Sequence, residues 1–208
     1  MDSFNIDLTE EQRLMKQSCR NFIDRVVAPF LQEEWQREWN MEPAERLPDK
    51  ILMAADDISI RTLGVPEKYG GVELNTETEI RSFAIIAEEI ARGDSGLADK
   101  LVQNWKVAVL LRNLAAEHLQ KKWFTRLVEE HGFLLAHCLT EPKGASDRWL
   151  PYNVPEAAMD TIAQKIDGGW KINGRKQFIS NGFDAGLYVV YANTSPGSGM
   201  LEGPSRFL

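Results

Sequence analysis

The stretch GFLLAHCLTEPKG, from Gly132 to Gly144, marks the change between two kinds of predicted structure. Before it, apolar residues recur at helical spacing in long segments with helix-capping residues. Its own FLLAHCL is an apolar run of strand length, and short strand-like segments follow between Gly-containing turns. We therefore expect an α+β protein, with a helical domain over residues 1–131 and an antiparallel β domain over residues 132–208.

Five helices are expected in the first domain. Thr9 with Gln12 and Thr76 with Glu79 each have the spacing of a capping box, and Pro29 should end or bend the first helix. The expected helices cover residues 13–27, 48–59, 79–93, 95–115 and 116–130, with Gly132 as the last stop signal. The apolar side predicted for residues 79–93 consists of Ile80, Phe83, Ala84, Ala87 and Ile90.

The strands expected in the second domain are residues 133–139, 160–166, 170–181 and 186–193. The Asp-Gly-Gly sequence before Trp170 predicts a hairpin. Phe178 and Ser180 alternate with Ile179, so on a strand they would share one face and could hold a planar heterocycle. The alternative is an edge strand with an ordinary Asn-Gly turn.

The composition excludes several classes of function. A net charge of −7 argues against nonspecific binding to nucleic acid or to an anionic membrane surface. No apolar run approaches the roughly 20 residues of a membrane span, and the N-terminus has no signal-peptide pattern, so we expect a cytoplasmic protein. Cys19 and Cys138 fall in apolar patterns that predict buried free thiols, and no Cys/His cluster indicates a metal site.

The turn after the first expected strand is rich in groups that bind anions or form hydrogen bonds. Thr140 and Ser146 supply hydroxyls, and Gly144 and Ala145 allow a ligand to approach the backbone closely. Such residues are also common in plain surface turns, so the segment alone leaves both interpretations open.

Two motifs in this region resemble the flavin-binding segments of the acyl-CoA dehydrogenase family, which read TEPGAGSD and WITNG. This chain has TEPKGASD at Thr140–Asp147 and FISNG at Phe178–Gly182. LTEEQ, GVPEKYGG and EEIARGDSGLA, earlier in the chain, resemble the same family. The resemblance covers essentially all 208 residues, in the family's order of a helical domain followed by a β domain.

The resemblance implies an FAD site in the second domain. Thr140 would bind the pyrimidine side of the flavin, Ser146 would reach the pyrophosphate and border the acyl-CoA substrate, and Phe178 would pack against the ring. The hydroxyl of Ser180 would point toward flavin N5. The residues implied to contact FAD are His137, Cys138, Leu139, Thr140, Ser146, Phe178, Ile179 and Ser180.

The implied activity is FAD-dependent α,β-dehydrogenation of an acyl-CoA thioester, with an electron-transfer flavoprotein as acceptor and a homo-oligomer for the complete protein. The family's catalytic carboxylate belongs to a C-terminal four-helix domain, so no residue of this chain is assigned as the base. We expect the chain to lack that domain and to be incomplete for catalysis. A noncatalytic subunit and a flavin monooxygenase of the same fold are the alternatives.

Several positions depart from the family pattern. Lys143 and Ala145 stand where glycine is common, so a positive φ there would be strained, although Lys143 could neutralise a phosphate. His137 stands where Tyr or Phe is common, and we interpret it as a packing residue rather than a general base. The segment Arg148–Met159 is longer than the family norm and would either pack on the chain's own surface or form a lid.

Overall fold

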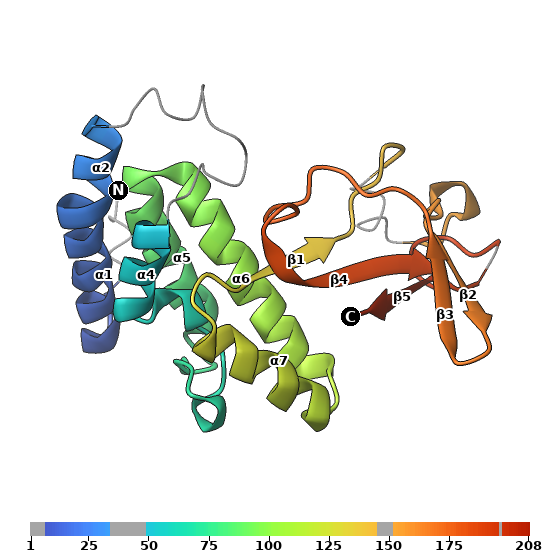
Figure 1. Ribbon diagram of the computed structural model, residues 1–208, viewed down its shortest axis with the longest axis horizontal. Helices are drawn as coiled ribbons and strands as arrows, with labels where there is room; N and C mark the ends of the chain where they lie inside the picture. Colours follow the sequence, from blue (N-terminus) through green and yellow to red (C-terminus); the bar gives the residue numbers. More distant parts are fainter. Residues whose placement is uncertain (1–6, 34–48, 145–151, 196) are drawn as a thin grey trace. The chain divides into compact units, whose positions relative to one another are not determined.

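The computed structural model describes residues 7–33, 49–144, 152–195 and 197–208 (Figure 1). The chain divides into two compact units, Met1–Phe133 and Leu134–Leu208. Every described α-helix lies in the first unit and every described strand of the sheet lies in the second. The predicted α+β class, with helices followed by a sheet, is therefore confirmed.

The first helix begins at the predicted capping box. Thr9 Oγ1 accepts a hydrogen bond from Gln12 N, and Gln12 Oε1 accepts one from Thr9 N, both at 3.1 Å. Pro29 does not end the helical path, because a π-helical segment, Ile23–Val27, joins α1 to α2. The wider turn accommodates a residue that cannot donate a main-chain hydrogen bond. The α-helices are α1 Glu10–Phe22, α2 Ala28–Glu33, α4 Asp49–Asp57, α5 Glu79–Gly93, α6 Ser95–Leu114 and α7 Glu117–Glu129.

The second predicted capping box is wrong. α5 begins at Glu79 with Thr78 as its N-cap, so Thr76 does not cap it. The Glu79 carboxylate instead forms two hydrogen bonds, of 2.8 and 2.9 Å, with the guanidinium of Arg112 on α6. This ion pair joins α5 to α6, so the Glu79 carboxylate does not cap the backbone at the start of α5.

The apolar side predicted for α5 is also partly wrong. Ile80 is 84% exposed and Ala84 is exposed, whereas Ile86 and Ile90 are buried. Glu79 is buried as well, because its ion pair satisfies the charge. The buried face of α5 is therefore rotated away from the one that hydrophobic periodicity predicts.

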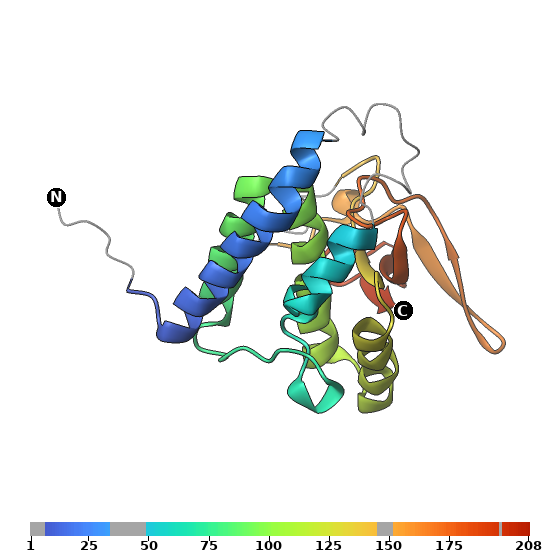
Figure 2. The same ribbon diagram turned by 60° about the vertical axis from the view of Figure 1, so that its left-hand side comes forward.

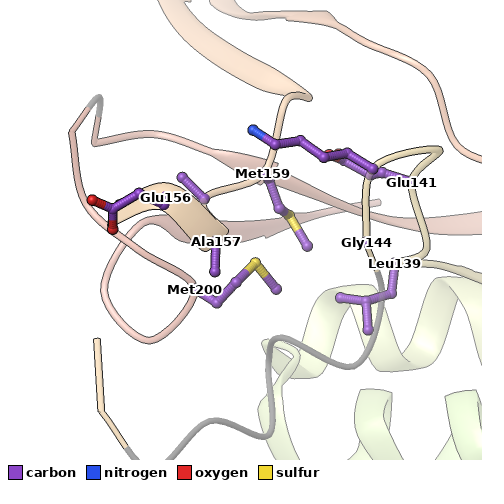
Figure 3. A pocket seen from close by; sticks show the side chains of 9 residues that line it. Leu139, Glu141, Gly144, Glu156, Ala157, Met159 and Met200 are labelled. Carbon is purple, nitrogen blue, oxygen red and sulfur yellow. The ribbon is translucent and has the colours of Figure 1, made fainter. Parts of the chain in front are cut away.

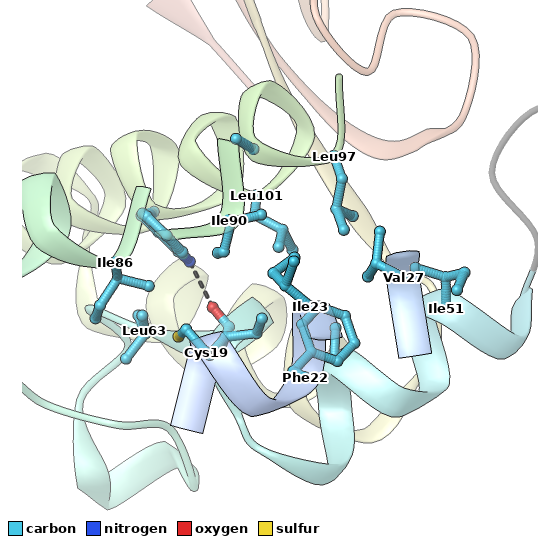
Figure 4. Close-up of a cluster of buried hydrophobic side chains, with 14 of the residues drawn as sticks. Cys19, Phe22, Ile23, Val27, Ile51, Leu63, Ile86, Ile90, Leu97 and Leu101 are labelled. Atoms are coloured by element: carbon cyan, nitrogen blue, oxygen red, sulfur yellow. Dashed lines mark hydrogen bonds between the residues drawn. The ribbon is translucent and has the colours of Figure 1, made fainter. Parts of the chain in front are cut away.

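The core of the first unit contains side chains from α1, α4, α5 and α6 (Figure 4). Trp105 is 1% exposed, and its indole Nε1 donates a 2.5 Å hydrogen bond to the carbonyl of Ile60. Its ring stacks on Phe83, with centroids 5.4 Å apart. Burial of Cys19 in this cluster agrees with its prediction as a buried thiol.

The second unit contains a mixed sheet, not the antiparallel one that we expected. β1 and β2 each pair with β4 in parallel, whereas β3 pairs with β2 and β5 pairs with β4 antiparallel. The predicted hairpin is confirmed, since Ile166 pairs with Gly169 across a turn in which Gly168 has φ +79° (Figure 2). The strands are β1 Leu134–Cys138, β2 Ile162–Ile166, β3 Gly169–Asn173, β4 Ala185–Asn193 and β5 Pro204–Phe207.

The strand expected over residues 170–181 ends early. β3 stops at Asn173, and a Cβ atom at Gly174 would lie 2.4 Å from the hydroxyl oxygen of Thr161. The chain then continues through loop and turn conformations up to β4, so Phe178 and Ser180 do not alternate on a strand. Sharing one strand face is therefore not the reason why these two side chains would act together.

None of the described helices is both long and apolar enough to cross a membrane.

Candidate functional site

The first motif begins where β1 leaves the sheet. Leu134, Leu135 and Ala136 are buried, so β1 is held firmly in the unit. Beyond it, the N–H of Glu141 donates a 3.0 Å hydrogen bond to the carbonyl of Gly144. This bond joins the two ends of the Glu-Pro-Lys-Gly segment, so the chain turns back on itself there.

Gln177, the residue before the second motif, bonds directly to this turn. The N–H of Gln177 donates to the carbonyl of Thr140 at 3.0 Å, and its side-chain Nε2 donates to the carbonyl of Glu141 at 3.2 Å. Asn181 Nδ2 donates to the carbonyl of Leu135 on β1 at 3.0 Å. The structure thus brings together the two segments that the sequence analysis selected.

A buried ion pair joins the same two segments. Glu141 is 5% exposed, and its carboxylate accepts hydrogen bonds from Lys176 Nζ at 2.7 Å, Asp160 N at 2.6 Å and Thr161 N at 3.0 Å. Burial alone would raise the pKa of Glu141, but the hydrogen bonds from Lys176 and Thr161 outweigh it and hold the pKa below its ordinary value. Neither Glu141 nor Lys176 was among the site residues expected from the sequence.

Phe178 is the most exposed of the candidate-site residues that the structure describes. Its side chain is 87% exposed, and its backbone adopts φ +54°. Among the described non-glycine residues, only Ser59, Phe178 and Asn181 have positive φ. A bulky residue in this region is strained, and such strain is concentrated at functional sites. Ile179 and Ser180 follow it, both half-buried.

The side chains of the first motif differ in what they can reach. Cys138 and Leu139 are buried, with 6% and 5% of their surface exposed, whereas Thr140 is half-buried. His137 Nε2 lies 3.0 Å from the hydroxyl oxygen of Tyr191, and the two rings meet edge to face. This contact fits the interpretation of His137 as a packing residue.

Lys143 is not strained, because it is absent from the described residues with positive φ. Its Nζ lies 3.4 Å from Asp160 Oδ1, and both side chains are more than half exposed. Ala145, Ser146 and the first part of the predicted lid, residues 148–151, lie outside the described residues. In the remainder of that segment, Tyr152 is 61% exposed and Met159 is buried.

A small cavity of about 90 Å³ lies beside the turn (Figure 3). It is much smaller than the roughly 300–1,000 Å³ of ordinary ligand sites. It therefore could not enclose a ring system such as a flavin, and Phe178 is not in its wall. The residues that line it are Leu139, Glu141, Lys143, Gly144, Glu156, Ala157, Ala158, Met159 and Met200.

Among the described residues, no group of three or more His, Cys, Asp and Glu side chains could hold a metal ion. The site combines the exposed aromatic ring of Phe178 with two half-buried hydroxyl residues, Thr140 and Ser180. This combination suits a planar ligand with polar edges.

Comparison with known proteins identifies the family. Residues 9–131 match the family model described as acyl-CoA dehydrogenase, N-terminal domain. This match covers more than half of the chain, which therefore belongs to the acyl-CoA dehydrogenase family.

Individual relatives agree with this assignment. Cyclohex-1-ene-1-carbonyl-CoA dehydrogenase of Syntrophus aciditrophicus is 31% identical over 209 residues, covering 100% of this chain and 45% of that protein. A glutaryl-coenzyme A dehydrogenase solved with glutaryl-CoA is 28% identical with a TM-score of 0.77, covering 100% of this chain and 47% of its own. An acyl-CoA dehydrogenase from Bacillus anthracis, solved in complex with FAD, is 26% identical with a TM-score of 0.74, covering 98% of this chain and 31% of its own.

The chain spans about half the length of the curated relatives that it matches.

Proposed function

We propose that this chain is part of an FAD-dependent acyl-CoA dehydrogenase and that its second unit supplies a face on which FAD binds. The observation that carries the proposal is Phe178, an exposed aromatic ring on a strained backbone, anchored against the turn that holds Thr140. Exposed apolar surface and backbone strain are both unfavourable for folding alone, so their coincidence favours a ligand contact. The FAD complex of the Bacillus anthracis relative supports the choice of ligand.

The residues of this chain would bind and orient the cofactor. Phe178 would pack against the flavin ring, while the hydroxyls of Thr140 and Ser180 would bind its polar edges. Ser146 would reach the pyrophosphate and border the acyl-CoA substrate. FAD, when bound, supplies the acceptor for the hydride that leaves the β carbon of the acyl group. Hydrogen-bond donors held in place by the two turns would stabilise the negative charge that develops on the ring.

The substrate class that we propose for the complete protein is an acyl-CoA thioester. The names of the relatives support this class, since they include a cyclohexene-carbonyl-CoA and a glutaryl-CoA dehydrogenase. An electron-transfer flavoprotein is the proposed acceptor, and a homo-oligomer is the proposed assembly. We assign no general base to this chain, because the family's catalytic carboxylate belongs to the C-terminal domain. Glu141 does not suit that role, since it is buried and engaged in an ion pair.

Titration of FAD with the purified 208-residue chain, followed by flavin fluorescence, tests the proposal. We expect a saturable change in flavin emission near one FAD per chain, because on binding the flavin leaves water and its contact with its own adenine for the protein surface. Phe178→Ala should weaken binding by about tenfold or more, which corresponds to a stacking contact worth about 1–3 kcal/mol. Wild-type protein that is folded but leaves flavin emission unchanged would contradict the proposal.

A further inference from the structure

We infer that Glu141 and Lys176 are positioning residues, whose buried ion pair holds the turn that carries Thr140 against the turn that presents Phe178. The inference rests on the proposed function, because it concerns the geometry of the same FAD-binding face. Neither side chain needs to touch the cofactor for this role.

The Glu141 carboxylate connects three separate segments of the second unit. Oε1 accepts from Lys176 Nζ and from the N–H of Thr161, and Oε2 accepts from the N–H of Asp160. Lys176 Nζ also donates to the carbonyl of Leu139 at 3.2 Å. Residues 139–141, 160–161 and 176 are therefore fixed together around a single carboxylate.

This arrangement reaches Phe178 through the backbone. Lys176 precedes Gln177, whose two hydrogen bonds tie it to Thr140 and Glu141. Because Phe178 is 87% exposed, packing contributes little to where its ring lies. Its position depends instead on the hydrogen bonds before it, at Gln177, and after it, at Asn181.

Burial distinguishes this ion pair from a surface pair. The side chains of Lys176 and Glu141 are 12% and 5% exposed, whereas those of Lys143 and Asp160 are 61% and 62% exposed. A buried pair cannot exchange its partners for water without a large penalty, while an exposed pair can. The first pair can therefore restrain the two turns, and the second cannot.

Substitutions at the pair test the inference when each has a matched control. Glu141→Gln preserves shape but removes the charge, and Lys176→Met removes the donor. Glu202→Gln and Lys165→Met make the same chemical changes at exposed positions of the same unit. The double variant Glu141→Gln/Lys176→Met leaves no unpaired buried charge, so it remains informative if a single variant fails to fold.

Two measurements on the 208-residue chain decide the outcome. Amide hydrogen exchange without FAD should rise by about tenfold or more over residues 139–144 and 176–182 in the Glu141 or double variant, with the first unit unchanged. FAD affinity should fall by at least about tenfold, while Lys176→Arg, which keeps the charge, should retain most of it. Both control variants should remain within about twofold of wild type in both measurements.

The inference is overturned if the folded double variant matches the controls in amide exchange. It is also overturned if exchange rises but FAD affinity stays at the wild-type value. A wild-type chain that binds no FAD contradicts the proposed function instead. In that case the exchange measurement alone still decides whether the pair holds the two turns together.

Discussion

The substitution Phe178→Gly removes an aromatic ring from a backbone conformation that glycine adopts readily. Replacing phenylalanine by glycine usually destabilises a protein, because packing is lost and the unfolded chain gains freedom. At Phe178 both of these destabilising effects are opposed by the release of backbone strain, because φ is +54°. The neighbouring Phe183 is exposed too but is absent from the described residues with positive φ, so it provides a matched comparison.

The expected magnitudes follow from exposure and backbone conformation. An aromatic side chain has about 200 Å² of surface, so the small part of Phe178 that is covered, at 87% exposure, contributes about 0.6 kcal/mol of burial. Greater freedom of the unfolded chain destabilises the variant by a further ~0.5–1 kcal/mol. Glycine adopts the left-handed conformation without strain, which stabilises the variant by about 1–2 kcal/mol. Phe178→Gly should therefore change the free energy of unfolding by less than about 1 kcal/mol.

Phe183→Gly should behave in the ordinary way. Phe183 is 69% exposed, so the lost burial is about 1.5 kcal/mol, and the added chain freedom brings the total to about 2 kcal/mol. Urea unfolding of both variants, followed by circular dichroism, measures the difference. FAD titration of the same samples should show weaker binding for Phe178→Gly despite its near-normal stability.

The reasoning is refuted if Phe178→Gly destabilises the apo protein as much as Phe183→Gly does. That result would mean that the left-handed backbone at Phe178 carries no strain to release. If wild type and Phe178→Gly bind FAD with equal affinity, the Phe178 ring does not contribute to cofactor binding.

Three further predictions concern the rest of the chain. Glu79→Gln should lower the free energy of unfolding in urea by about 1.5–3 kcal/mol, because it weakens two charge-assisted hydrogen bonds to the half-buried guanidinium of Arg112, and a loss below about 0.5 kcal/mol would contradict this. Cys19 and Cys138 should react with a thiol reagent at pH 8 only after unfolding, since burial raises the pKa of both thiols and that of Cys19 to about 12. Fast labelling of the native protein would contradict this prediction. Although burial alone would raise the pKa of Glu89, its ion pairs with α1 outweigh this effect, so the pKa is lowered overall. Its contribution to stability should therefore be complete above about pH 5 and disappear as the pH falls through the folded-state pKa. Glu89→Gln should flatten the acid limb of a curve of unfolding free energy against pH.

Features set by local sequence were predicted well. The capping box at Thr9 and the hairpin turn at Gly168 depend on residues a few positions apart, and the structure has both. The second capping box failed because a distant partner, Arg112, takes the Glu79 carboxylate. The parallel pairing of β1 with β4 could not be read from strand patterns, since it joins segments far apart in the chain.

In the candidate site, too, local motifs were found from the sequence, whereas contacts between distant residues were not. Sequence motifs located both of its segments, and hydrogen bonds from Gln177 to Thr140 and Glu141 place them side by side. The sequence did not indicate the Glu141–Lys176 pair, because Glu and Lys are ordinarily surface residues and nothing local marks them as buried partners. The positive φ of Phe178 was missed for a similar reason, since glycine or asparagine is the usual signal for that conformation.

The most direct test of the central claim, that the second unit forms an FAD-binding face, is the visible absorption spectrum of the purified chain after gel filtration with excess FAD. A flavin band should elute with the protein at close to one flavin per chain. Protein that elutes without flavin, while circular dichroism shows it to be folded, would contradict the claim.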